Sequence, residues 1–208
     1  MSNACHPDDK ARCVLKAASD VFLEHGFSAA TTDMIQRAAG VSKATVYSRY
    51  PNKEALFTAV VEDKCSRFTQ LVQAVEVKPG NIRKVLEDIG RTYLRILLSA
   101  EALAMHRVVL ADAVRFPHLA RAFYQAGPAA MDAIVTNHLT VAANAGEINV
   151  QTLGLESAAA IFMSMVRGEA QLIALTHPDS QASDVQINQW VNSAVTTFLR
   201  AYGTSGMQ

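Results

Sequence analysis

Apolar residues recur every three to four positions through nearly the whole of this 208-residue chain. That spacing places them on one face of an α-helix, and no alternating run of β-branched residues is long enough to predict a strand. Half of the residues are hydrophobic and 18% are charged, which excludes disordered, collagen-like and low-complexity chains and suffices for a sizeable core. We therefore predict an all-α globular fold.

Glycine, proline and short polar residues divide the first third of the chain into four predicted helices. A glycine with positive φ ends a helix, and Ser, Thr, Asp or Asn begins one by accepting a hydrogen bond from its free amides. These signals predict a first helix from Asp8 or Asp9, after Pro7, to Gly26, a second from Thr31 or Thr32 to Gly40, a third from Ser42 to about Tyr50, and a long fourth from Asn52 through Val72.

Further breaks divide the rest of the chain, and the clearest of them is Pro79-Gly80. The other breaks fall at 116–117, 127–128, 146 and 177–178. They predict helices over residues 82–99, 102–115, 118–125, 128–145, 155–175 and 183–202. We assign residues 1–55 to a small N-terminal domain and residues 56–208 to a larger helical domain.

Residues 31–53, TTDMIQRAAGVSKATVYSRYPNK, have the layout of a helix-turn-helix, with two short capped helices and a tight turn at 39–41. Gly40 permits the turn, and small apolar contacts from Ile35, Ala38, Val41 and Val46 would fix the angle between the helices. The second helix would enter the major groove of DNA, where base edges distinguish all four base pairs. Its short or polar side chains would approach bases and phosphates; they are Ser42, Lys43, Ala44, Thr45, Ser48 and Arg49.

The wider segment GFSAATTDMIQRAAGVSKATVYSRYPNKEALF resembles the DNA-binding signature of the TetR family of bacterial transcriptional repressors, and the match runs from about Ala11 to Phe57. The shared features are Gly26-Phe27, Thr31-Thr32, the turn at 39–42, Thr45-Val46-Tyr47 and Tyr50-x-x-Lys53. The resemblance implies that phosphates are held by Thr31 or Thr32, Tyr47, Tyr50 and Lys53. It also implies that the groove is faced by Lys43, Ala44, Thr45, Ser48 and Arg49. Tyr50 departs mildly from the family, in which many members have phenylalanine.

The family further implies a C-terminal domain that binds a small ligand and dimerises through its last two long helices. Residues 187–202 carry an apolar stripe of helical period, and residues 158–166 are apolar nearly all round. Such a helix must be covered on every side, either within one subunit or by a second subunit. The resemblance favours a homodimer, with contacts expected at Phe162, Val166, Trp190, Val191, Ala194 and Phe198. The run RFPHLARAFYQAGPAAM, residues 115–131, also resembles AefR-like and AcrR-like regulators.

Ligand contacts are expected on the helices where ligands of the family usually sit. The candidates are Tyr93, Met105, His106, Phe123, Phe162, Met163 and Arg167. Methionine suits an adaptable apolar pocket because its thioether side chain is flexible. Ordinary core packing is nevertheless the simpler explanation for Met105, Met163 and Met165.

Several classes of function lack a sequence signal. The chain has no phosphate-binding glycine loop, nucleophile elbow or evident pair of carboxylates, so we do not expect an enzyme. The histidines at positions 25, 106, 118, 138 and 177 lack a ligand-type neighbour at helical spacing, so we expect neither a metal nor a cofactor. The polar N-terminus and the lack of an apolar run of about 18 residues predict a cytoplasmic protein without a membrane partner. Cys5, Cys13 and Cys65 form no CxxC pair, which fits reduced thiols.

The charge balance at first argues against a nucleic-acid partner, because nineteen basic residues match nineteen acidic ones. Residues 31–53, however, hold Arg37, Lys43, Arg49 and Lys53 against Asp33, a local excess of three (four minus one). A dimer presents this excess twice. We therefore expect modest non-specific binding, and an affinity that depends on two correctly spaced half-sites.

These features predict a homodimeric repressor that binds a pseudo-palindromic operator and is released by a small apolar or amphipathic effector. Two other kinds of regulator remain open: one that senses a protein partner, and a redox sensor built on Cys5 and Cys13. A protein-sensing regulator would lose no DNA affinity on adding compounds and would expose an apolar patch beyond its dimer surface.

Overall fold

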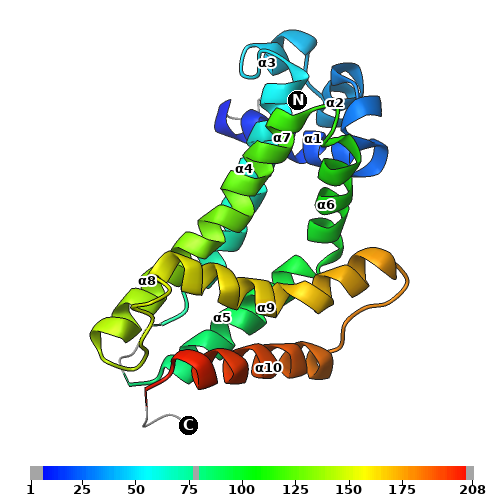
Figure 1. The fold of residues 1–208 in the computed structure, drawn as a ribbon. Coiled ribbons are helices and arrows are strands. Elements are labelled where there is room, and N and C mark those ends of the chain that lie inside the picture. The colour runs from blue at the N-terminus through cyan, green and yellow to red at the C-terminus, as the bar shows by residue number, and fades with distance from the viewer. Residues whose placement is uncertain (1–6, 77–79, 205–208) are drawn as a thin grey trace. The chain divides into compact units, whose positions relative to one another are not determined.

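The computed structural model describes residues 7–76 and 80–204, and the regular structure within these ranges is helical (Figure 1). An isolated antiparallel bridge joins Ile148 to Gly203, but the described chain forms no strand. The helices in chain order are α1 Pro7–Ala29, α2 Thr32–Ala39, α3 Lys43–Tyr47, α4 Lys53–Gln73, α5 Ile82–Leu97, α6 Ala100–Asp112, α7 Pro117–Tyr124, α8 Ala130–Asn144, α9 Leu155–Thr176 and α10 Asp184–Tyr202. The predicted all-α fold is confirmed.

Several predicted helix boundaries differ from those observed; α3, for example, ends at Tyr47 rather than near Tyr50. At Gly26 the chain leaves the helical region, with φ 76° and ψ 165°, but helical bonding resumes and α1 ends at Ala29. The predicted break at Gly127-Pro128 is wrong, because residues Gln125–Ala129 form a π-helix between α7 and α8. The wider turn of a π-helix relieves the clash between a proline ring and the preceding turn, so Pro128 lies inside the helical run. Pro79 of the predicted boundary lies outside the described residues.

The chain divides into two compact units. Unit 1 comprises Met1–Ser66 with Ala104–Gly127, and unit 2 comprises Arg67–Leu103 with Pro128–Gln208. Each unit has its own cluster of buried apolar residues. The functional boundary after residue 55 stays a prediction.

Aromatic side chains dominate the core of unit 1. Phe22 meets Phe57 edge-on, with ring centroids 5.1 Å apart, and Phe27 meets the same ring at 5.1 Å. Phe27 also packs against Phe116 at 4.8 Å. Edge-to-face pairs of this kind are favourable beyond the area that they bury. The three-helix segment α1–α3 is thus anchored on a fixed aromatic core.

The core of unit 2 is built from α5, α8, α9 and α10, with α10 packed on both α5 and α9. Five of the six predicted dimer contacts lie inside this core, namely Phe162, Val166, Val191, Ala194 and Phe198, each at most 4% exposed. Trp190 is only partly buried. One subunit already covers these five side chains, and the dimer contacts stay a prediction. Any interface on α9 and α10 must use the outward faces of these helices.

Helix α9 is the most membrane-like of the described helices in its length and composition. Among the described helices it is the one that is long and apolar enough, by length and composition, to cross a bilayer. It nevertheless carries Glu156, Arg167 and Glu169, and its buried residues lie in the core of unit 2. These are the properties of a core helix.

Candidate nucleic-acid interface

Helices α2 and α3 are short, capped at their starts and joined by a glycine turn. The Thr31 hydroxyl accepts a hydrogen bond from the Met34 amide, and the Ser42 hydroxyl accepts one from the Thr45 amide. Gly40 adopts the left-handed conformation, φ 65° and ψ 30°, in which a side chain would be strained. The predicted caps and turn of the helix-turn-helix are thus observed.

Two apolar residues hold the two helices on the core of unit 1. Ile35 and Val46 are fully buried, and Val41 is half-buried. Ala38, which was predicted to join them, is exposed. Because its side chain is small and exposed to solvent, Ala38 does not set the angle between the helices.

Polar contacts also join the start of α2 to α3. The hydroxyl oxygens of Thr32 and Tyr47 lie 3.1 Å apart, and the Lys43 ammonium lies 2.9 Å from the Asp33 carboxylate. The hydrogen bond to Asp33 and its negative charge raise the pKa of Lys43. The ammonium also lies 6.0 Å from the centre of the Tyr47 ring. These contacts bring the predicted phosphate-binding and base-reading residues to one surface.

Most side chains predicted to face DNA are exposed. The exposed residues are Thr31, Ser42, Lys43, Ala44, Tyr47, Ser48 and Arg49, whereas Thr32, Thr45, Tyr50 and Lys53 are half-buried. The Ser42 and Thr45 hydroxyls lie 2.9 Å apart, and the Ser48 hydroxyl donates to the Thr45 carbonyl. Burial is the main cause that raises the pKa of Tyr50. The exposed face therefore carries short polar groups and two cations, which suits contact with a polyanion.

Lys53 is engaged inside the protein. Its ammonium donates to the carbonyls of Phe27, Ser28 and Ala30, at distances of 2.8, 3.3 and 2.9 Å. A residue that sequence reasoning missed, Asp112 of α6, accepts hydrogen bonds from both the amide and the hydroxyl of Ser28. Asp33 was likewise counted only as a local charge, although it pairs with Lys43.

The predicted ligand-binding residues fall into two clusters, one in each unit. In unit 1, Met105 is buried, and the rings of His106 and Phe123 meet edge-on at 4.8 Å. In unit 2, Phe162 and Met163 are buried in the core. Their burial fits ordinary core packing, the simpler explanation for the methionines.

A charged group lies within the apolar surroundings of unit 2. The charge of Arg167 on α9 acts on both Tyr93 of α5 and Asp132 of α8. Burial raises the pKa of both Tyr93 and Asp132, and the nearby guanidinium opposes this rise. Such a polar group among apolar side chains could orient a bound molecule.

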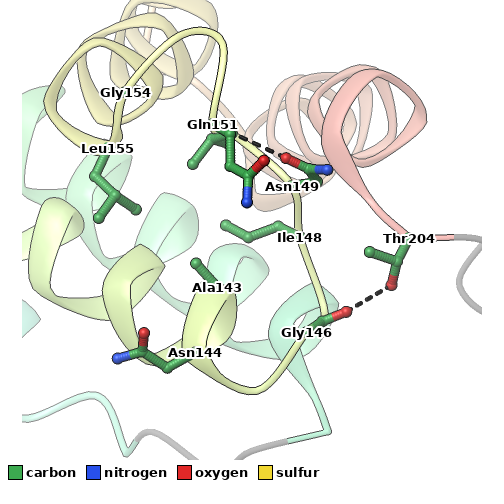
Figure 2. Close-up of a pocket in the computed structure, with 10 residues that line it drawn as sticks. Ala143, Asn144, Gly146, Ile148, Asn149, Gln151, Gly154, Leu155 and Thr204 are labelled. Carbon is green, nitrogen blue, oxygen red and sulfur yellow. Dashed lines mark hydrogen bonds between the residues drawn. The ribbon is translucent and has the colours of Figure 1, made fainter.

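Two pockets of unit 2 are lined by residues other than the predicted ligand-binding residues. One, of about 530 Å³, is lined by the end of α8, the loop before α9 and Thr204, whose hydroxyl donates to the Gly146 carbonyl (Figure 2). A second, of about 460 Å³, lies between α8 and α9 and includes Asp132. Among the described residues, no group of three or more His, Cys, Asp or Glu side chains could hold a metal ion.

The cysteines differ in their environment. Cys65 is buried, and burial raises the pKa of its thiol to about 11, so at neutral pH it is a thiol rather than a reactive thiolate. Cys13 is exposed, and Cys5 lies outside the described residues. A redox sensor that uses Cys65 is therefore disfavoured.

Sequence families match both parts of the chain. Residues 14–60 match the family of bacterial regulatory proteins called tetR, and residues 84–204 match the C-terminal domain of AefR-like transcriptional repressors. Among curated relatives, the transcriptional repressor AcnR of Corynebacterium glutamicum is 31% identical over 88 residues, which cover 41% of this chain and 45% of AcnR. The chain spans 33% to 49% of the length of three such relatives.

Solved structures cover nearly the whole chain. A TetR-family transcriptional regulator from Mesorhizobium loti has a TM-score of 0.87 at 27% identity, over 96% of this chain and 99% of that one. The flavonoid-responsive regulator FrrA has a TM-score of 0.80 at 33% identity, over 94% of this chain and 98% of that one. The chain therefore belongs to the TetR family of bacterial transcriptional regulators, DNA-binding proteins that typically act as repressors, and its C-terminal part is AefR-like.

Proposed function

We propose that this protein is a homodimeric repressor that occupies a pseudo-palindromic operator through α3 and leaves it when a small molecule binds. The observation that carries this proposal is the surface formed by α2 and α3, in which capped short helices present Lys43, Tyr47, Ser48 and Arg49 to solvent. A rigid helix start with short polar side chains fits the major groove. Repression follows from steric exclusion of RNA polymerase.

The outward face of α9 supports the homodimer. Its exposed residues Ser157, Ile161, Ser164, Gly168 and Leu172 follow at intervals of three or four, so they share one side of the helix. None of these five residues is charged, and Leu172 is 63% exposed. An uncharged stripe with exposed apolar side chains is typical of a surface that a partner covers. We place the dimer contact on this stripe, which replaces the buried residues predicted from the sequence.

A small apolar or amphipathic effector is the proposed release signal. Tyr93 and Arg167 offer polar contacts within the largely apolar unit 2, and the regulator FrrA, 33% identical, is named as flavonoid-responsive. We therefore propose planar phenolic compounds as the first class to test. The effector weakens DNA binding only if it prefers the conformation in which the two recognition helices are wrongly spaced.

The remaining parts of the proposal follow from this role. We propose that residues 1–55 act as the DNA-binding domain and residues 56–208 as the sensing and dimerisation domain. We also propose that the protein acts in the cytoplasm, where bacterial DNA is accessible, and has no enzymatic activity.

The direct test is a titration of the full chain against duplex DNA, first without and then with members of a compound panel. We expect sequence-preferring binding that selected phenolic compounds reverse, with alkyl compounds of similar hydrophobicity as the control panel. Binding that no compound reverses, together with capture of DNA-bound protein by another protein, would instead support the protein-sensing regulator.

A further inference from the structure

The turn formed by the last three residues of α1 and by Ala30, residues 27–30, is fixed by a lysine from a later helix. Lys53, the first residue of α4, donates to the carbonyls of Phe27, Ala30 and Ser28 at 2.8, 2.9 and 3.3 Å. An ammonium group has three N–H donors, so these contacts use all of them. The same ammonium lies 4.5 Å from the centre of the Phe27 ring.

The positive charge of Lys53 stabilises the C-terminus of α1 rather than the N-terminus of α4, to which the residue belongs. A cation in the first turn of a helix opposes the helix dipole, so Lys53 gains nothing from α4. The carbonyls of Phe27 and Ser28, at the end of α1, and that of Ala30, just after it, accept hydrogen bonds from the ammonium, and helix C-termini leave such carbonyls without helical partners. Lys53 therefore acts as a C-terminal cap supplied by a different helix.

A carboxylate holds the same turn from the other side. Asp112, the last residue of α6, accepts a hydrogen bond from the Ser28 amide at 3.0 Å and another from the Ser28 hydroxyl. The ring of Phe27 also makes an edge-on contact with Phe116, which lies four residues after Asp112 in the chain. The turn thus has its carbonyls bound by a cation and its amide bound by an anion.

The clamped turn leads directly into the DNA-binding surface. Thr31, the cap of α2, follows Ala30, and Thr32 meets Tyr47 of α3. We propose that Lys53 is a positioning residue that, together with Asp112, fixes residues 27–30 and so the placement of α2 and α3, rather than a residue that binds a DNA phosphate. This inference rests on the DNA-binding function proposed above.

The test compares Lys53→Met, which keeps the apolar stem and removes the ammonium, with Lys43→Met, which removes an exposed cation from the same surface. Affinity is measured over a salt series for a duplex selected by the unmodified protein and for a random-sequence duplex. For Lys53→Met we expect operator affinity to fall about tenfold or more. We expect its affinity for random DNA and its salt dependence to stay unchanged. Lys43→Met should lower the slope of log K against log salt by about one unit.

Asp112→Asn supplies a second, independent variant. Loss of an acidic group strengthens general attraction to DNA, so a fall in operator affinity for this variant can come only from misplacement of the turn. Faster hydrogen exchange of the Ala30 amide in both variants is also expected. A slope lowered by about one unit for Lys53→Met, with unchanged exchange, would show a phosphate contact and overturn the inference. If the unmodified protein selects no DNA sequence, the proposed function fails instead. Unchanged hydrogen exchange of the Ala30 amide in the variants would still refute the positioning of residues 27–30 by Lys53 and Asp112.

Discussion

At the scale of single residues, burial separates the chemistry of Cys65 from that of Cys13. Cys65 is 8% exposed and burial raises its thiol pKa to about 11, whereas Cys13 is exposed. In a Cys5→Ser variant at pH 8, we expect a thiol reagent to modify Cys13 rapidly and Cys65 only as fast as the protein opens. Mass spectrometry of the labelled peptides checks this result, and equally rapid labelling of Cys65 would contradict it.

The same thiol predicts a dependence of stability on pH. Its folded-state pKa of about 11 lies above the ordinary value of 9.0, so the folded state holds the proton more tightly. The contribution of Cys65 to the free energy of unfolding is therefore complete below pH 9 and is lost as the pH rises toward 11. Cys65→Ala should remove this part of the alkaline decline in chemical denaturation experiments, and Cys13→Ala should leave it in place.

Asp33 restrains Lys43 in the free protein, and this contact has a testable consequence for DNA affinity. Asp33→Asn removes the ion pair at 2.9 Å and one negative charge from the DNA-facing surface. We expect affinity for random-sequence DNA to rise by up to about fivefold, a modest effect because both groups are solvated. Asp184→Asn, which breaks a surface pair with Arg95 in unit 2, is the matched control. Equal effects of the two variants on fluorescence anisotropy titrations would assign the change to net charge alone.

At the scale of helices, α5 and α10 approach each other through Gly90. A Cβ added at this position would lie 2.9 Å from a methyl carbon of Val191, which is stiff and fully buried. Gly90→Ala gains about 1 kcal/mol of helix propensity but overpacks the contact at a cost of about 1 to 3 kcal/mol. We therefore expect a net loss of stability in urea denaturation. In the Val191→Ala background the same substitution should become neutral or stabilising, and an effect of equal size in both backgrounds would rule out the close contact.

Local signals explain which elements could be predicted from the sequence. Thr31, Gly40 and Ser42 act on their own helices, and each performs the predicted role of cap or turn residue. Pro128 misled the prediction, because its effect depends on whether the chain can widen into a π-helix. The contacts of Lys53 and Asp112 with residues 27–30 could not be predicted, since they join segments 23 to 84 positions apart.

At the scale of the whole molecule, burial in one subunit decides which surface is left for a second. The spacing of apolar residues correctly placed Phe162 and Phe198 on helix faces that must be buried. The sequence could not show that both side chains are buried within a single chain. A charge at either position would disrupt the core rather than report on assembly. The stripe on α9 escaped prediction because Ser157, Ser164 and Gly168 are not apolar and stand out only once their exposure is known.

The dimer contact proposed on α9 predicts how assembly responds to charge. Leu172→Glu combined with Ile161→Glu should give monomers in sedimentation experiments and should weaken operator binding, because two half-sites are no longer bound together. Leu110→Glu, an equally exposed apolar position in unit 1, is the control and should leave the protein dimeric. Dimers that persist in the double variant would place the interface elsewhere.

Sequence-specific DNA binding by α3 is the central property of the proposed function. Selection of duplexes from a random library by the full chain, followed by sequencing, measures this property directly. We predict enrichment of two inverted half-sites whose centres are separated by about one helical turn, ~34 Å, or slightly more. We also predict that Arg49→Ala or Lys43→Ala shifts the preference at particular base pairs. Selection that enriches no sequence, or that enriches the same sequences with all three proteins, would contradict the central claim.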